Sequence, residues 1–447
     1  MRAAGKLLTM GMLALAGAAT GEVGQGKVWD PVAARKIAVE AVVDCAEGRV
    51  AKCREGFRRA LELQPHHSEY LQLLAGAEER LGHPQAALEA LALLHRQGFE
   101  LAFEPPDEWV AKVVARPDYQ RLYQETAPLR APVARSKVAF RLPYREMLPE
   151  GLAYDAKTGD FFVSGVRERR IVRRSAKGEI SDFVPPGSGF LWSALGMEAD
   201  PAGRRLWVAT TAYPPMVGYQ PPLEGSAALL AFDLDSGKLL ARFTSSRPGK
   251  KGFNDVCIAP DGAVFVTDHE ERPGTLYRLA PGADLASRKL EPFGDPDALG
   301  SPEGMALSPD GRYLFVADYS YGIVRYELAT GKHLHLPDAP EATLIGIDHL
   351  EYRDGGLIAV QNGGEPYSVL RLELSPEQDR VLSRQVLERE HPAFSDPTLG
   401  VMVGDVFYYV ANSQWGKLDD DDKFPPASQL AEPIILALPL SQGKKSL

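Results

Sequence analysis

The strongest constraint on the fold of this chain is a repeat of about 49 residues that runs through its later part. Each copy has a polar or small residue, an alternating strand, an Asp/Gly turn and a strand rich in β-branched and aromatic residues. Four clear copies cover 149–165, 253–268, 302–318 and 347–362, and two weaker copies cover 194–210 and 397–412. One period through so many copies indicates a repeat architecture rather than two unrelated sheet domains.

The spacing of the copies predicts a six-bladed all-β propeller. Asn254 and Glu303 are 49 residues apart, Glu303 and Asp348 are 45 apart, and the 104 residues from Glu150 to Asn254 leave room for the weaker copy at Leu195. A further pair of strands follows each copy, which gives six units of four strands. Such a ring must close, so we expect strand 136–143 to join the blade that contains 433–440. The propeller is therefore predicted over 136–441.

An N-terminal helical domain is predicted over 30–130, because the apolar period there is that of helices. The segment 60–99 resembles a tetratricopeptide repeat, with matches at Pro65, at Leu81-Gly82 and at Ala86. The resemblance implies binding of a protein or peptide partner, whereas the alternative is a helical domain that only packs. The fold class expected is thus α+β multidomain, a helical tetratricopeptide-like domain followed by the propeller.

The first residues have the layout of a secretory signal peptide. Arg2 and Lys6 precede an apolar run, 7–19, that ends in small residues and is too short to span a bilayer. We therefore expect residues 1–20 to be removed and the protein to be periplasmic or secreted. Cys45 and Cys53 lie eight residues apart, and in an oxidising compartment they either form a disulfide or remain two buried thiols.

Charge and missing motifs exclude several classes of function. The chain has 50 Lys and Arg against 60 Asp and Glu, a formal charge of -10, which disfavours a nucleic-acid binder. No Gly-x-Ser-x-Gly elbow, His-Glu-x-x-His pair or phosphate-binding loop occurs. The acidic run 419–422 lacks the ligand spacing of an EF-hand and is interpreted as a solvated loop.

Alignment of the copies places four oxygen-bearing side chains at one position, just before the strand that lines the channel. These residues are Glu150, Asn254, Glu303 and Asp348, whereas the weaker copies offer Leu195 and one of 397–399. Carboxylate and amide oxygens are the ligands that Ca²⁺ prefers. Three carboxylates about 4 Å apart would repel by about 4 kcal/mol per pair at an effective dielectric near 20. We therefore expect Ca²⁺, or another divalent cation, at the channel mouth; the alternative is that the side chains diverge into solvent.

With these residues the later part of the chain, about 145–440, resembles the six-bladed calcium propellers of the regucalcin, gluconolactonase and paraoxonase type. The resemblance implies that Asp348 is the general base and that Asp255, after Asn254, holds a second calcium ion as in paraoxonases. At the position of Glu303 the family motif usually reads Asn-Gly, so Glu303 is a departure from the family. Relatives often have an Arg that anchors substrate two residues before the channel Asn, and here that residue is Gly252. His349, beside Asp348, is a candidate proton relay or a structural histidine, and His269 is interpreted as loop surface.

The leading hypothesis is an exported, calcium-dependent hydrolase of lactones or related esters. Asp348 and His349 would be catalytic, and the four channel-mouth residues would hold the metal. The substrate would be a small molecule, with a protein partner as a further ligand of the helical repeats and with no nucleic acid or membrane span. The alternative is a non-catalytic periplasmic scaffold in which any calcium is structural; a strictosidine-synthase-like role on the same fold is a third hypothesis.

Overall fold

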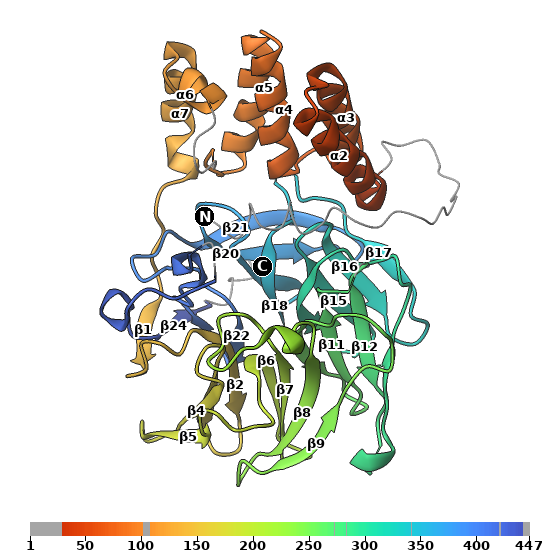
Figure 1. The fold of residues 1–447 in the computed structure, drawn as a ribbon, viewed down its shortest axis with the longest axis vertical. Helices are drawn as coiled ribbons and strands as arrows, with labels where there is room; N and C mark the ends of the chain where they lie inside the picture. The colour runs from red at the N-terminus through yellow and green to blue at the C-terminus, as the bar shows by residue number, and fades with distance from the viewer. Residues whose placement is uncertain are drawn as a thin grey trace, which may run out of the picture.

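The computed structural model of the protein describes residues 29–101, 108–271, 273–282, 284–340, 342–419 and 422–440. Helices come first in the chain and strands follow, and Figure 1 shows the helices as a layer above one face of the strand region. The predicted signal peptide, 1–20, lies outside the described residues. Within the described residues no helix is long and apolar enough to cross a membrane.

Six α-helices are present in the described residues, and they occupy the segment predicted to be helical. They are α2 (Pro31–Ala46), α3 (Val50–Leu63), α4 (Ser68–Arg80), α5 (Pro84–Arg96), α6 (Glu108–Val114) and α7 (Pro117–Thr126). Asp30 caps α2 by accepting from the Ala33 N–H over 2.9 Å, and α2 and α5 both begin with proline, which suits the first helical position. The likeness to tetratricopeptide repeats stays a prediction.

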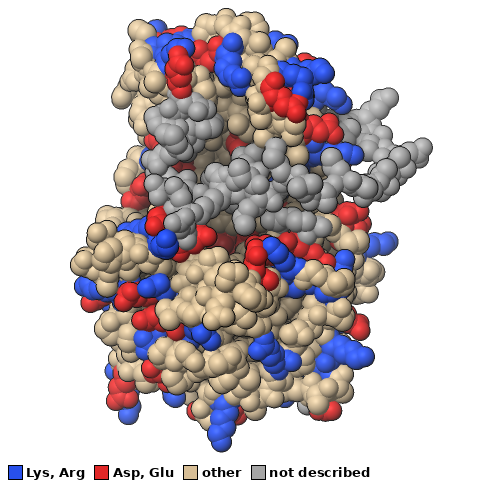
Figure 2. All heavy atoms as spheres, in the orientation of Figure 1, with Lys and Arg blue, Asp and Glu red and all other residues tan. Residues whose placement is uncertain are grey.

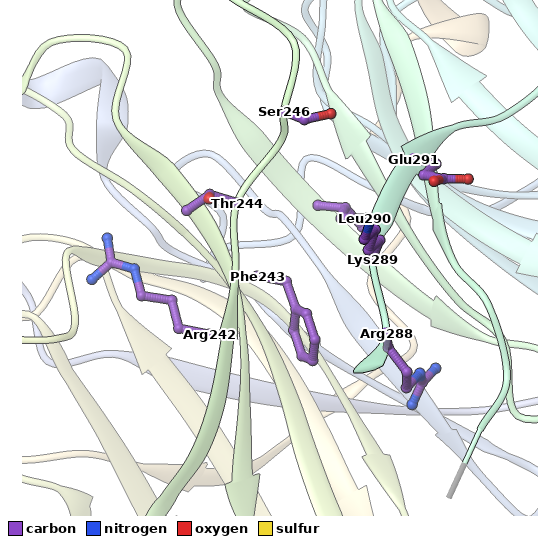
Figure 3. Close-up of a pocket in the computed structure, with 8 residues that line it drawn as sticks. All are labelled: Arg242, Phe243, Thr244, Ser246, Arg288, Lys289, Leu290 and Glu291. Atoms are coloured by element: carbon purple, nitrogen blue, oxygen red, sulfur yellow. The ribbon is translucent and has the colours of Figure 1, made fainter. Parts of the chain in front are cut away.

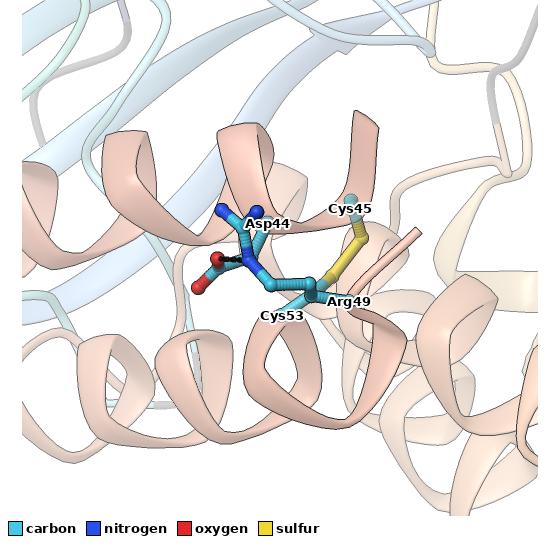
Figure 4. The surroundings of a disulfide bond; sticks show 4 residues. All are labelled: Asp44, Cys45, Arg49 and Cys53. Carbon is cyan, nitrogen blue, oxygen red and sulfur yellow. Dashed lines mark hydrogen bonds and ion pairs between the residues drawn. A yellow bond between two sulfur atoms is a disulfide. The ribbon is translucent and has the colours of Figure 1, made fainter. Parts of the chain in front are cut away.

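Cys45 and Cys53 form a disulfide between the end of α2 and the start of α3 (Figure 4). Of the two alternatives, a disulfide or two buried thiols, the structure has the disulfide. Their Cα atoms are 5.1 Å apart, within the range that a disulfide spans. Arg49, in the turn between the helices, pairs with Asp44 over 2.5 Å. Cys257 is a free thiol, buried within the strand region.

The strands of the described residues form six four-stranded antiparallel sheets, as the repeat predicted. We number the sheets as blades one to six in chain order, and each is given from its innermost strand outward. Blade one is β2 (Pro149–Asp155), β3 (Asp160–Gly165), β4 (Arg170–Arg174) and β5 (Ile180–Val184); blade two is β6 (Ser193–Asp200), β7 (Arg205–Thr211), β8 (Ala227–Asp233) and β9 (Leu239–Phe243); blade three is β10 (Phe253–Ile258), β11 (Val264–Asp268), β12 (Thr275–Leu279) and β13 (Leu290–Pro292).

The second half of the ring repeats this order and closes it. Blade four is β14 (Pro302–Leu307), β15 (Tyr313–Asp318), β16 (Gly322–Glu327) and β17 (His333–His335); blade five is β18 (Ile347–Arg353), β19 (Gly356–Gln361), β20 (Ser368–Leu374) and β21 (Val381–Arg389); blade six is β22 (Gly400–Val403), β23 (Val406–Val410), β24 (Ile434–Pro439) and β1 (Lys137–Arg141). Because β1 pairs with β24, the first strand completes the last blade, and the predicted closure is confirmed.

A β-bulge recurs at the start of the innermost strand in blades one to five. In blade three, for example, Phe253 pairs with Asp268 but Val256 pairs with Val266, so one extra residue is inserted on β10. The same shift occurs on β2, β6, β14 and β18. A bulge re-aims the side chains beside it. The repeated bulge therefore gives the channel residues of these blades a common orientation.

Glycine lets neighbouring innermost strands approach closely behind the channel residues. A Cβ on Gly304 would lie 2.5 Å from the Asp348 carbonyl oxygen and 2.7 Å from the His349 Cα. A Cβ on Gly151 would lie 2.3 Å from the Leu195 carbonyl oxygen. Side chains at these positions would separate the blades, so the Glu-Gly pairs of the repeat serve the packing of the ring.

The hydrophobic core lies between adjacent blades. One cluster joins blades four and five through residues such as Phe315 and Leu357, and another joins blades two and three through Trp207 and Phe253. These side chains are 0–1% exposed. Each sheet thus buries both faces, which explains the near-continuous apolar runs in the second strands.

The helical layer packs on blades four and five at the face where β15 and β19 end. Arg35 of α2 donates to the Ser320 hydroxyl over 2.5 Å, the Gln97 side chain accepts from the Thr343 N–H over 2.9 Å, and the Glu100 N–H donates to the Glu365 carbonyl over 2.8 Å. Figure 2 shows acidic and basic side chains interspersed over the visible face of both parts, without a continuous basic surface.

Candidate functional site

The structure places the four predicted channel residues at one position of the fold. Glu150, Asn254, Glu303 and Asp348 each directly follow the first paired residue of β2, β10, β14 and β18. Their exposed fractions are 4–6%. In blade two this position is Leu195, and in blade six the Thr398 hydroxyl donates to the Glu150 carbonyl oxygen over 2.9 Å. The alignment of the repeat therefore identified the residues that the fold makes equivalent.

The three carboxylates act on one another electrostatically. Burial, followed by the charge of Asp348 and with a smaller effect from Glu303, raises the pKa of Glu150 well above its usual value. Burial, followed by the charge of Glu303, raises the pKa of Asp348 to about 7. The pKa values of Glu150 in blade one and Asp348 in blade five are thus both raised in part by the charge of Glu303 in blade four.

The donor atoms fit a hard cation in kind, but they are not arranged as a ligand set. Within the described ranges no group of three or more His, Cys, Asp or Glu residues is placed to hold a metal ion. The Asn254 Nδ2 donates a hydrogen bond to Glu303 Oε2, whereas a calcium ligand would offer the amide oxygen. What the site provides is a set of buried oxygen atoms from carboxylate and amide side chains at equivalent positions of four blades.

Two aromatic side chains and a histidine that the repeat alignment did not include also reach this space. His269 Nδ1 lies 3.2 Å from Glu303 Oε2, and His269 Nε2 contacts the Tyr213 hydroxyl. The expectation that His269 lies on the loop surface is therefore wrong, because its side chain is only 21% exposed and contacts the site. Burial opposes its charge, but Glu303 and its acidic neighbours outweigh burial and raise the pKa of His269 to about 9. Trp415 Nε1 donates to Glu150 Oε2 over 2.7 Å.

Asp348 is held by a chain of hydrogen bonds from blades four and five. The Asn362 Nδ2 donates to Asp348 Oδ2 over 2.9 Å and also to the Pro397 carbonyl over 2.9 Å. The Tyr319 hydroxyl donates to the Asn362 Oδ1. With the amide oxygen and nitrogen both engaged, Asn362 has a fixed orientation and presents its N–H group to the carboxylate.

His349 lies behind the channel mouth rather than beside the carboxylate oxygens. Its ring stacks on Phe407 at 5.9 Å with an interplanar angle of 10°, and neither ring nitrogen has a hydrogen-bond partner among the described residues. The nearest acidic group is Glu351, whose Oε1 lies 3.8 Å from Nε2. This distance is too long for a hydrogen bond. The proposed relay through His349 therefore has no hydrogen bond to Asp348 in this structure.

Asp255, the other residue expected to bind calcium, is engaged with the neighbouring blade. Its Oδ2 accepts from the Met305 N–H over 3.0 Å, and burial, which outweighs the opposing charge of His349, raises the pKa of Asp255 to about 6. Glu198 also lies behind the mouth and accepts from the Ile258 N–H over 2.6 Å. Both carboxylates join innermost strands of adjacent blades, which is a structural role.

Three of the residues that the sequence analysis did not place at the site share a position of their own. His269, Tyr319 and Asn362 each follow the last residue of the second strand, in the segments Thr267–His269, Ala317–Tyr319 and Val360–Asn362. Asp268 and Asp318, one residue earlier, bind the loop before the innermost strand; Asp318 Oδ2, for example, accepts from the Gly300 N–H over 2.7 Å. The same repeat alignment, extended by one residue, is the signal that identifies this second ring of site residues.

A separate pocket of about 230 Å³ lies between the outer strands of blades two and three (Figure 3). Its lining includes Arg242 and Phe243 at the end of β9, Leu290 at the start of β13, and Arg288 just before that strand. Figure 3 shows the Arg242 and Arg288 side chains pointing to opposite sides of the Phe243 ring. Because these strands are the outermost of their blades, the pocket is not part of the channel mouth.

Fold and site together define a six-bladed propeller with a buried acidic channel mouth. Residues 148–336 match the family model described as the SMP-30/Gluconolactonase/LRE-like region. The matched segment includes Glu150, Asn254 and Glu303 and ends before Asp348. No curated protein matches the chain by sequence.

Solved structures similar to this chain include a gluconolactonase from Xanthomonas campestris, at 17% identity over 69% of this chain and 97% of that one, with a TM-score of 0.45. A calcium-binding protein, regucalcin, from Agrobacterium tumefaciens is 17% identical over 69% and 93%, with a TM-score of 0.47. A putative oxidoreductase (glucose dehydrogenase) from Thermus thermophilus is 16% identical over 68% and 100%, with a TM-score of 0.48. At these identities the similarity does not identify a substrate.

Proposed function

We propose that this protein is a divalent-metal-dependent hydrolase of lactones or related esters. The observation that supports the proposal is that Glu150, Glu303 and Asp348 are buried carboxylates at equivalent positions of three blades, and that the charges of Glu303 and Asp348 add to burial in raising the pKa of Glu150. The match of 148–336 to the gluconolactonase-like family model supports the choice of reaction. Ca²⁺ is the cation that suits these oxygen donors.

Glu150, Asn254, Glu303 and Asp348 would hold the cation. When bound, the cation would polarise the carbonyl group of the substrate. Asp348 is the group best placed to accept a proton from water: Asn362 holds its Oδ2, and burial with neighbouring charge brings its pKa to about 7. Tyr213 and His269 line the same space beside Glu303 and would contact the substrate. His349 would act only through a rearrangement that brings it to Asp348.

Calorimetric titration of metal-free protein with calcium chloride, followed by a panel of lactones and aryl esters, tests this proposal. We expect calcium binding and calcium-dependent turnover, with both lost in Glu150→Gln and turnover lost in Asp348→Asn. Glu291→Gln is the matched control, because Glu291 is an exposed carboxylate on the outer strand β13. Turnover that survives both chelation and Asp348→Asn would refute the hydrolase proposal.

We also propose that the protein acts in the periplasm or outside the cell. The apolar run 7–19 after two basic residues supports this location, and so does the disulfide between Cys45 and Cys53. Fractionation of cells that express the full chain, with mass determination of the mature N-terminus, tests it.

The second candidate is a binding protein without catalysis. The absence of a formed metal-ligand group within the described residues and the extensive packing of the helical layer on the propeller favour it. In that case the helical layer would bind a protein partner and the propeller would be its rigid support. Partner capture from periplasmic extract that Glu303→Ala leaves unchanged, together with no turnover on the whole panel, would decide for this candidate.

A further inference from the structure

The junction between the helical layer and blade five contains three arginine side chains, which we call the junction arginines. Arg384 and Arg389 belong to β21, and Arg130 follows the last helical turn (Ala127–Leu129) before the propeller begins. Arg130 is far from Arg384 and Arg389 in the sequence, so the docking of the helical layer brings it to them. None of them belongs to the channel mouth, and the proposal below does not depend on the proposed hydrolase activity.

All three junction arginines gather around the turn that ends α5. Arg384 Nη1 donates to the Gln97 carbonyl oxygen over 2.8 Å. A Cβ on Gly98, the next residue, would lie 3.6 Å from Arg389 Nη2 and 2.7 Å from the Leu129 carbonyl oxygen. Arg130 directly follows Leu129. Two guanidinium groups therefore lie against consecutive residues of one turn, with the third beside them.

Only Arg130 has its charge balanced within the described residues. Its Nε lies 2.9 Å from Glu100 Oε1, it donates to the Thr126 hydroxyl, and its guanidinium stacks on Tyr123 at 4.1 Å. The Nε atoms of Arg384 and Arg389 are buried without a hydrogen-bond partner, and neither side chain makes an ion pair in the described part of the chain. Arg389 is only 7% exposed.

The carboxylates near β21 make no ion pair with Arg384 or Arg389 in the described part of the chain, although the charge of Glu390 favours the charged form of Arg389. Glu388 precedes Arg389 and so points to the opposite face of the strand, where its Oε1 accepts from the Arg135 and Ser136 N–H groups. Glu390 is exposed, and its Oε1 accepts from the Tyr367 N–H. The carbonyl groups at the end of α5 carry only partial charge. A buried guanidinium without a counter-ion is strongly unfavourable.

We propose that Arg384 and Arg389 bind a small oxyanion, such as phosphate, sulfate or a carboxylate, between the helical layer and blade five. The planar guanidinium presents paired N–H donors that match two oxygens of such an anion. Burial and the neighbouring Arg389 lower the pKa of Arg384 to about 10, and burial and Arg130, opposed by Glu390, lower the pKa of Arg389. An anion between the two guanidinium groups would offset the repulsion between them. The bound anion would fasten the helical layer to the propeller.

The test is calorimetric titration of the full-length protein with phosphate, sulfate and acetate, compared with chloride at the same ionic strength. We expect at least one oxyanion to bind and to raise the Tm where chloride does not. In Arg389→Met we expect binding at least about tenfold weaker, because the paired donors are lost. Arg371→Met is the control, because Arg371 on β20 donates instead to the Asp354 carbonyl of a propeller loop.

The Tm without added anion separates this role from simple structural support. If Arg389 only supported the fold, Arg389→Met would lower the Tm in every buffer. If Arg389 binds an anion, the variant keeps the wild-type Tm in chloride and loses the increase in Tm that phosphate causes. Arg384→Met provides the same comparison if the first variant does not fold. Binding of no oxyanion beyond chloride, or wild-type oxyanion affinity in both variants, would overturn the proposal.

Discussion

Trp415 in blade six donates its indole N–H to Glu150 Oε2 in blade one over 2.7 Å, which joins an aromatic reporter to a candidate metal ligand. Tyr213 meets the Trp415 ring edge-on at 6.3 Å. The loop after β23 therefore reaches the channel mouth and touches the residues that would bind a cation. Any change in the charge or position of Glu150 acts directly on this indole.

The intrinsic fluorescence of the protein is therefore expected to change when calcium is added to metal-free protein. A cation that draws the Glu150 carboxylate toward itself weakens the indole hydrogen bond and alters the Trp415 emission. Trp415→Phe should remove most of this signal without weakening calcium binding, because the indole N–H and the cation compete for the Glu150 carboxylate. Trp192, which stacks with Arg242 on blade two, provides the control in Trp192→Phe. An unchanged signal in Trp415→Phe would contradict this assignment.

Asn362 is expected to affect the rate of the reaction because its side chain holds the Asp348 carboxylate. Asn362→Ala leaves the carboxylate without its N–H donor and should lower kcat by about tenfold to a hundredfold, because a charge-assisted hydrogen bond is worth about 1.5–3 kcal/mol. Tyr319→Phe removes only the hydroxyl that orients Asn362, so it should have a smaller effect in the same direction. The pH profile of kcat is the measurement that distinguishes positioning from general destabilisation. An unshifted profile with reduced Tm would indicate a structural role.

The stability of metal-free protein should decrease as the pH rises from about 4 to about 7. Burial raises the pKa of Asp348 from 3.8 to about 7, so the folded state binds more protons than the unfolded state in this window. The associated stability is complete below the unfolded pKa and is lost as the pH passes the folded pKa. Thermal unfolding across this range should show a shallower slope in Asp348→Asn and in the presence of calcium. A Tm that rises over the same range would contradict the prediction.

The repeat alone determined the blade number, the closing strand and the position of Glu150, Asn254, Glu303 and Asp348. These features follow from the period and from the turn residues, which are local. The orientation of His349 depends instead on Phe407 of the next blade, a contact with no signature in the sequence. For the same reason the sequence could not show whether the carboxylates close around an ion.

His269 was misplaced because a histidine after a strand, in a segment with Glu270 and Glu271, has the composition of a surface loop. The structure turns it inward because the Asp268 carboxylate accepts from the N–H groups of Gly252, Glu270 and Glu271. That hydrogen-bonded turn directs the side chain toward Glu303. Comparison with Tyr319 and Asn362 at the same position of the repeat would have revealed it.

The disulfide should contribute measurably to the helical layer. Closing a loop of this length lowers the entropy of the unfolded chain and contributes about 2–3 kcal/mol. Cys45→Ser with Cys53→Ser should lower the denaturant midpoint by a corresponding amount, and a reducing agent should affect the wild type but not the double variant. Equal sensitivity of both proteins to the reducing agent would show that the disulfide does not stabilise the fold.

Gly304→Ala should damage the site without altering any of its polar groups. The added methyl would lie 2.5 Å from the Asp348 carbonyl oxygen and 2.7 Å from the His349 Cα, and both are backbone atoms that cannot turn aside. β14 and β18 must then move apart, which separates Glu303 from Asp348 and costs about 1–3 kcal/mol of stability. Gly189→Ala is the matched control, because a Cβ there meets no atom within 4 Å. We expect Gly304→Ala to lower both calcium affinity and Tm, and Gly189→Ala to change neither. If Gly304→Ala bound calcium as tightly as the wild type, the contact between the innermost strands would not set the geometry of the channel mouth.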